Sequence, residues 1–234
     1  PGSICAVAEI IVALDGDDLV VVEVEPPGVS PANLGCVPLA DVPFRTDKGA
    51  LSSTVLASGA EAHRAFETAL AEWRVLMAAA LSGLAARSLE IGVEYVKARH
   101  QFGVPIGSFQ SVAHKLADVA TEVDGATLLW QESTWALDEG EPNAIGLAQM
   151  ALLFASETAE RTSGASLHFH GGYGFMLEYD IQLYVRRAKA WPLAEGSRVS
   201  GYQSLADQLF GPVQVGASAD AVSSRAVSSH AGGV

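Results

Sequence analysis

The chain has 234 residues, 49% of them hydrophobic, and 14 Lys and Arg against 27 Asp and Glu give a formal charge of −13. This composition describes a soluble globular protein with one substantial core and excludes disordered and fibrous classes. The acidic balance disfavours nucleic acid and anionic membrane surfaces as partners. The chain has two cysteines and no signal-like segment, so we expect a cytoplasmic location. Its longest uninterrupted apolar runs predict no transmembrane helix.

Strand-forming sequence opens the chain. β-branched residues dominate positions 8–14 and 19–24, and the Asp-Gly-Asp-Asp stretch at 15–18 has the composition of a hairpin turn. Residues 40–44 favour a further short strand. The chain starts on Pro1 without an initiator Met and runs directly into this β region, as a fragment of a longer protein would.

Three long helical segments follow the β region. Good helix formers predict one long helix or two abutting helices over 61–97, a second helix over 108–137 and a third over 143–163, ended by Gly164. Apolar stripes mark one face of the second helix (Leu116, Val119, Val123, Ala126, Trp130) and of the third (Leu147, Met150, Ala151, Phe154). We therefore predict a helical bundle whose broad apolar surface favours an oligomer. Residues 211–234, rich in Ser, Ala and Gly, predict a disordered tail.

Four short clusters of residues have candidate chemistry, and the first two lie before residue 180. Residues 99–103 (Arg-His-Gln-Phe-Gly) lie between two predicted helices, where Gly103 as a C-cap would be a purely structural explanation. Residues 167–175 hold two histidines and three glycines, which predicts a loop where backbone can approach a flat or phosphorylated ligand. This loop follows no strand, so it is not a dinucleotide-binding fingerprint. His168 and His170 lack a third ligand at a recognised spacing, so we expect no metal site.

Two further clusters lie closer to the C-terminus. The basic run at 184–189 is either a solvated helix face or a site for an anionic partner. In Ala194-Glu195-Gly196-Ser197, Ser197 can cap a final helix, which is the structural explanation. Alternatively, Glu195 beside bare backbone can serve as a general base in a pocket. The local sequence does not decide between the structural and the functional explanation of either cluster.

In their order along the chain, these clusters form a recognisable series. Arg99-x-x-Phe102-Gly103 is followed by Pro-Ile-Gly-Ser-Phe-Gln at 105–110, then by His-Gly-Gly-Tyr-Gly-Phe at 170–175 and by Leu-Tyr-Val-Arg-Arg-Ala-Lys at 183–189. In content and spacing this series resembles the C-terminal half of the acyl-CoA dehydrogenases, flavoenzymes that oxidise acyl-CoA thioesters. The resemblance covers about residues 6–210.

The resemblance implies an α+β, mostly α fold. Residues 1–57 would be the end of a middle β domain, a partial sheet or barrel, and residues 58–210 an antiparallel four-helix bundle. FAD would be the cofactor, electron-transfer flavoprotein the electron acceptor, and the assembly a homo- or hetero-oligomer, dimer or tetramer. The family's N-terminal helical domain and first β strands are missing from this sequence, so a longer chain or a second chain would supply them.

The resemblance also assigns roles to individual residues. FAD contacts fall to Arg99, Phe102, Gln110, His168, Gly171, Gly172 and Ser197, of which the first three would reach the flavin of a neighbouring subunit. Arg74 and Gly196 would bind the acyl-CoA substrate. Glu195 would abstract the α-proton while flavin N5 accepts the β-hydride, giving trans-2-enoyl-CoA. The main-chain N–H of Glu195 would stabilise the developing enolate.

Three residues depart from the family pattern. His168 replaces a usual Gln, Ser197 replaces Thr, and Ala194 replaces a bulky aromatic residue in many members. The small Ala194 predicts room for a branched, cyclic or steroid-derived acyl group. Two alternatives to the dehydrogenase stay open. One is a non-catalytic partner subunit that completes the flavin site of another chain, and the other is an acyl-CoA oxidase.

Overall fold

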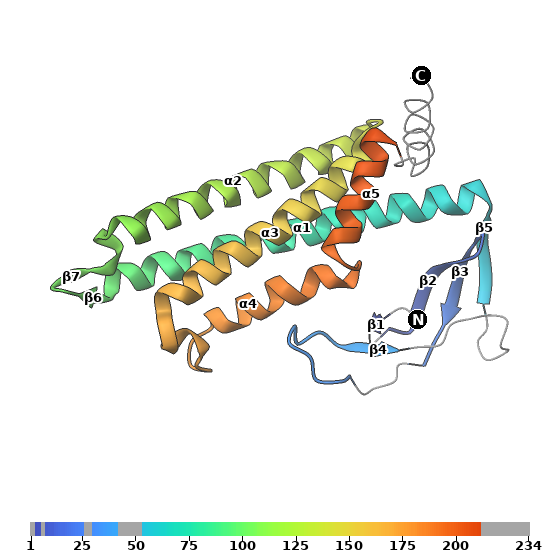
Figure 1. The fold of residues 1–234 in the computed structure, drawn as a ribbon. Helices are drawn as coiled ribbons and strands as arrows, with labels where there is room; N and C mark the ends of the chain where they lie inside the picture. Colours follow the sequence, from blue (N-terminus) through green and yellow to red (C-terminus); the bar gives the residue numbers. More distant parts are fainter. Residues whose placement is uncertain (1–2, 6–7, 26–29, 42–52, 212–234) are drawn as a thin grey trace, which may run out of the picture.

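The computed structural model describes residues 3–5, 8–25, 30–41 and 53–211. Its helices are α1 (Ala60–Ala98), α2 (Gln110–Glu139), α3 (Ala144–His170), α4 (Ile181–Ala190) and α5 (Arg198–Phe210). The strands are β1 (Ser3–Cys5), β2 (Ile10–Asp15), β3 (Asp18–Glu23), β4 (Leu39–Asp41), β5 (Ser53–Ser58), β6 (His100–Gln101) and β7 (Val104–Pro105). Figure 1 shows the helices gathered in one bundle, with β2, β3 and β5 near the N-terminal part of α1. The predicted mostly helical fold is confirmed.

The predicted β-hairpin is present. β2 and β3 pair antiparallel from Ile10↔Glu23 to Asp15↔Asp18, and Gly16 takes a φ of 66° in the turn. β5 extends this sheet by pairing antiparallel with β3, and β1 pairs with β4. Within the described residues the strand predicted at 40–44 corresponds to β4, which begins one residue earlier and reaches Asp41. Residues 42–44 lie outside the described part of the chain.

α1 is a single helix of 39 residues, which decides between the two arrangements expected for 61–97. Its hydropathy reaches 1.4 over one 18-residue window, so among the described residues it alone is long and apolar enough to cross a membrane by length and composition. Core helices of globular bundles meet the same criteria, and 44% of this window is buried inside the structure. α1 packs along α3 and α2, which accounts for its apolar faces.

α3 corrects two predictions made from the sequence. It does not end at Gly164 but continues to His170, because residues beyond the glycine are buried against α1 and offset the roughly 1 kcal/mol that glycine costs inside a helix. The buried surface of α3 is also wider than the apolar stripe predicted for this helix. Phe154 is exposed, whereas Ala148, Leu152 and Ala159 on other faces are buried. α3 lies among α1, α2, α4 and α5, so nearly its whole circumference is covered (Figure 1).

Small residues let α1 and α3 approach closely. A Cβ at Gly92 would collide with the Ser166 side chain, whose Cβ lies only 3.1 Å from that position. The Ser166 Oγ donates a hydrogen bond of 2.6 Å to the Ser88 carbonyl of α1, so the polar groups at this crossing are satisfied without water. The stripe predicted on α2 also lies in the bundle, with Val119, Val123 and other members buried. The disordered tail predicted for 211–234 falls, from 212 on, outside the described residues.

Candidate functional site

The side chains of Arg74 and Glu195 meet although 121 residues separate them in sequence. Arg74 lies in α1 and its side chain is only 7% exposed; its Nε and Nη2 donate to Glu195 Oε1 over 2.7 and 2.5 Å. A charge-assisted pair of this kind fixes the position of a carboxylate. Glu195 Oε2 has no hydrogen-bond partner among the described residues. The sequence therefore identified two residues that the fold brings together, and the second carboxylate oxygen is available for chemistry.

The segment between α4 and α5 carries Glu195, and we call residues 191–197 the α4–α5 link. Pro192 opens a 3₁₀ turn over Trp191–Ala194, which stops α4, and Gly196 adopts a φ of 128° that a side chain would strain. Ser197 then caps α5, with its Oγ accepting from the Ser200 N–H over 3.1 Å. The structural role predicted for Ser197 is thus confirmed, and its predicted cofactor contact stays a prediction.

A cavity of about 520 Å³ lies beneath the α4–α5 link. Its walls come from α3 with Gln149 and Ser156, from the link, from the start of α5, and from Arg74 of α1. Leu152, Leu153 and Leu193 make part of the lining apolar. Arg74, Glu195 and Gly196 line this cavity, so the predicted base and both predicted substrate contacts share one hollow. Ala194 is exposed and is not among the lining residues.

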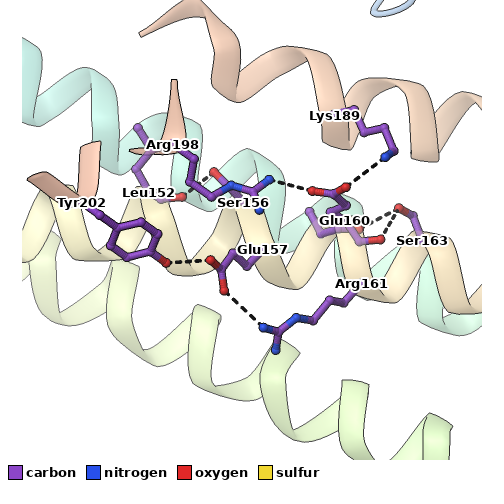
Figure 2. Close-up of polar contacts among 10 residues, drawn as sticks. Leu152, Ser156, Glu157, Glu160, Arg161, Ser163, Lys189, Arg198 and Tyr202 are labelled. Carbon is purple, nitrogen blue, oxygen red and sulfur yellow. Dashed lines mark hydrogen bonds and ion pairs between the residues drawn. The ribbon is translucent and has the colours of Figure 1, made fainter. Parts of the chain in front are cut away.

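Charged side chains fasten α4 and α5 to α3 beside this cavity (Figure 2). Glu160 of α3 accepts from Lys189 Nζ over 2.9 Å and from Arg198 Nη2 over 2.6 Å. One turn away, Glu157 accepts from Tyr202 Oη of α5 over 2.7 Å and pairs with Arg161 of α3. Hydrogen bonds from Arg198 and Lys189 lower the pKa of Glu160 below its ordinary value. Burial, then the hydrogen bond with Glu157, raises the pKa of Tyr202.

The basic run 184–189 is more than a solvated helix face. Lys189 pairs with Glu160, and the Arg187 guanidinium lies 5.7 Å from the centre of the Trp191 ring. Arg186 Nε is buried with no hydrogen-bond partner in the described structure. The interpretation of the run as a solvated helix face therefore holds for Lys189, which is exposed although it pairs with Glu160, and is incomplete for Arg186 and Arg187, which are half-buried.

A second group of predicted residues lies where α1 passes into α2. α1 ends at Ala98 with Arg99 as its C-cap, not Gly103, because the chain turns at Phe102 and Gly103 in the β6–β7 hairpin. Both turn residues have positive φ, 55° and 83°, and the Phe102 ring is 92% exposed at the tip. Gln110 begins α2 beside this hairpin and is also exposed. The Arg99 guanidinium has no hydrogen-bond or ion-pair partner in the described part of the chain.

The end of α3 adds the remaining predicted residues to this second group. Residues 167–170 belong to α3 rather than to a loop, and residues 171–175 form a 3₁₀ turn. His168 is exposed, while His170 is buried and stacks on Tyr95 of α1 with ring centroids 3.9 Å apart. Gly171 has a φ of 59°, and a Cβ at Gly171 or Gly172 would meet open space. The stack joins this turn to the end of α1 that carries Arg99.

The predicted site residues thus form two separate groups. Arg74, Glu195, Gly196 and Ser197 surround the cavity, whereas Arg99, Phe102, Gln110, His168, Gly171 and Gly172 occupy the end of the bundle near β6 and β7. Twenty-five residues of helix place Arg99 roughly 35 Å along α1 from Arg74. The two groups cannot contact the same part of one small ligand.

Two residues have roles in the structure that the sequence analysis did not assign. Glu160 carried no motif, although Glu157 and Arg161 at i and i+4 on the same helix signal a charged face. His170 was considered as a metal ligand, yet its Nδ1 lies 2.7 Å from the Ser166 carbonyl and its ring is a core element. His168 and His170 are two residues apart on a helix and face different directions. The described residues contain no group of three or more His, Cys, Asp or Glu placed to hold a metal ion.

Comparison with known proteins identifies the family of this chain. A model of the acyl-CoA dehydrogenase C-terminal domain matches residues 63–209. The probable acyl-CoA dehydrogenase YngJ of Bacillus subtilis is 40% identical over 124 residues, 53% of this chain and 32% of that protein. Subunit CarC of the caffeyl-CoA reductase–Etf complex of Acetobacterium woodii is 34% identical over 115 residues, 49% of this chain and 30% of that protein.

A solved structure agrees with these matches. The ChsE4–ChsE5 complex of Mycobacterium tuberculosis contains a chain similar to this one with a TM-score of 0.67 and 25% identity, over 84% of this chain and 53% of that one. The chain spans about a third of the length of the curated relatives it matches and about half of the solved chains. Since the family model matches more than half of the sequence, the chain belongs to the acyl-CoA dehydrogenase family, in the part that forms its C-terminal domain.

Proposed function

We propose that this chain carries the catalytic base of an FAD-dependent acyl-CoA dehydrogenase and that Glu195 is that base. The observation that supports the proposal most is the Glu195 carboxylate, held through Oε1 by Arg74 at the edge of a cavity of about 520 Å³. A general base must be positioned before its basicity matters. The pairing leaves Oε2 to accept the α-proton of an acyl-CoA thioester.

The residues of the second group fit a flavin adenine dinucleotide. The Arg99 guanidinium, exposed and without a partner among the described residues, suits a pyrophosphate, and the exposed Phe102 ring suits stacking on a flat group. The open space at Gly171 and Gly172 allows close approach of a ligand to backbone. FAD, when bound, supplies the acceptor for the β-hydride as the α-proton leaves, so that the thioester becomes a trans-2-enoyl thioester.

The link also offers a donor for the substrate carbonyl. The Glu195 N–H donates to the Pro192 carbonyl over 3.3 Å, a long hydrogen bond that a thioester oxygen can replace at little cost. Gly196 beside it leaves room for substrate against the backbone. In this proposal Arg74 acts on substrate through Glu195, and the direct substrate contact expected from the sequence stays a prediction.

The distance between the two groups supports an oligomer. Because Arg99 follows the C-terminal end of α1, far along that helix from the Arg74 that holds Glu195, each flavin would meet Glu195 of one chain and Arg99 of another. The partner is a second copy or a related chain, and electron-transfer flavoprotein is the proposed acceptor. The second candidate function, a subunit that only completes a partner's flavin site, is favoured by this same division of the residues.

An anaerobic visible spectrum of the purified protein tests the proposal. Straight-chain, branched, cyclic and steroid-derived acyl-CoA thioesters are added in turn to the FAD-loaded protein. Bleaching of the flavin band by one of them supports the dehydrogenase and names its substrate class. A flavin that stays oxidised with every thioester contradicts the proposal. A protein that binds FAD only after mixing with a partner chain, and whose Glu195→Gln variant is reduced normally there, favours the second candidate.

A further inference from the structure

The α4–α5 link has little packing beneath it. The cavity lies under residues 192–197, and Leu193, one of its lining residues, is 64% exposed. Trp191 packs against the bundle core at one end of the link. Between Trp191 and α5, the ion pair of Glu195 with Arg74 is the one side-chain hydrogen bond or ion pair that ties the link to an element other than α4 and α5 in the described structure. A segment that spans a hollow depends on how its two ends are held.

One carboxylate of α3 holds both ends. Lys189 lies two residues before the link and Arg198 directly after it, and each donates to a different oxygen of Glu160, over 2.9 and 2.6 Å. Figure 2 shows the two cations converging on Glu160 from α4 and α5. Because both oxygens are used, the carboxylate fixes the separation of the two link ends as well as their distance from α3.

We infer that Glu160 is a positioning residue for the reaction, which sets the place of Glu195 by fixing Lys189 and Arg198 at the two ends of the α4–α5 link. This inference rests on the function proposed above. Arg198 and Lys189 favour the ionised form of Glu160 and lower its pKa, in agreement with a carboxylate that pairs with both cations. We call these three side chains the clasp. A displacement of about 1 Å at a catalytic group can cost up to a hundredfold in rate, so the clasp can control turnover.

Glu157 supplies a matched control. It lies on the same helix one turn away and contacts α5 through Tyr202, yet it touches neither end of the link. Glu160→Gln and Glu157→Gln each remove one negative charge from the same face of α3. Any difference between these variants reports the link rather than the general electrostatics or the stability of α3.

Two measurements on the purified protein test the inference. In the first, hydrogen–deuterium exchange is followed in the peptide that covers 191–197. We expect exchange there to quicken about tenfold in Glu160→Gln and to stay at the wild-type rate in Glu157→Gln. In the second, the limiting rate of flavin reduction per bound flavin should fall about tenfold in Glu160→Gln, with KM for the thioester nearly unchanged.

The outcomes separate this inference from the proposed function. Equal exchange in the two variants, or an equal fall in rate per bound flavin, overturns the role of Glu160. A fall in flavin content without a fall in rate per bound flavin also overturns it, because that result describes a purely structural residue. If no thioester reduces the wild-type protein, the proposed function fails, while the exchange measurement still decides whether Glu160 holds the link.

Discussion

The α1–α3 crossing and the α4–α5 link are stabilised by different physical means. At the crossing, Gly92 and Ser166 pack so closely that no further atom fits, and Ser166 satisfies a backbone carbonyl. The link spans a cavity and is held by Arg74 and Glu160 through charged contacts. Close packing tolerates no change in volume, whereas ion pairs tolerate changes in volume but not in charge. We therefore expect changes at the crossing to lower stability and, under the proposed function, changes at the link to lower the reaction rate.

The largest expected effect comes from Glu195→Gln. The amide keeps the size of the side chain but cannot accept the α-proton, so we expect flavin reduction by acyl-CoA to fall at least about a thousandfold. Flavin content should stay near wild type, whereas the thermal midpoint should fall modestly, because the nearly buried Arg74 loses its counter-ion. Stopped-flow reduction together with a thermal melt measures both. A variant that is reduced at the wild-type rate removes Glu195 from the role.

Arg74→Lys should have the next largest effect. Lysine keeps the charge but replaces the fork of Nε and Nη2 by a single ammonium, so the carboxylate loses its fixed position. We expect the reduction rate to fall about 10- to 100-fold and the free energy of unfolding to fall by about 1–3 kcal/mol. Stopped-flow kinetics and urea denaturation measure the two quantities. If the variant loses stability but keeps its reduction rate, Arg74 stabilises the helical bundle and does not position Glu195.

Gly92→Ala tests the crossing. The new Cβ would press on Ser166, and overpacking of this kind costs about 1–3 kcal/mol in the free energy of unfolding. Gly83→Ala in the same helix is the control, because a Cβ there meets nothing within 4 Å and should stabilise by about 0.5–1 kcal/mol. Chemical denaturation of the two variants gives the comparison. Equal stabilities would mean that the crossing is looser than the structure has it.

The smallest expected effect is the acid response of the clasp. The folded-state pKa of Glu160 is lowered, so its stabilisation is complete above the unfolded-state pKa and is lost as pH falls through the folded-state value. Glu160 is partly exposed and solvent weakens the pairing, so the contribution is below about 1 kcal/mol. Thermal melts should show wild type losing more stability than Glu160→Gln between roughly pH 5 and pH 3. Parallel curves would exclude the clasp from the acid response.

Local sequence patterns predicted the local structure well. The hairpin at 15–18, the helical conformation over 61–97 and the Ser197 cap all depend on neighbouring residues, and all are present, although the sequence did not decide between one helix and two over 61–97. Gly164 misled the prediction because tertiary burial outweighs the intrinsic preference of a single glycine. The contact of Arg74 with Glu195 depends on how helices are rotated against one another, which no local pattern encodes. The resemblance pointed to both residues, and only the fold joined them.

Exchange of the substrate α-proton tests the central claim most directly, because it follows the base and needs no electron acceptor. Wild-type protein loaded with FAD is incubated in D₂O with an acyl-CoA thioester that binds but is not oxidised, and the label is read by mass spectrometry. The account predicts deuterium at the α-carbon with wild type and none with Glu195→Gln. Equal labelling by the two proteins would contradict it, since another group would then be the base.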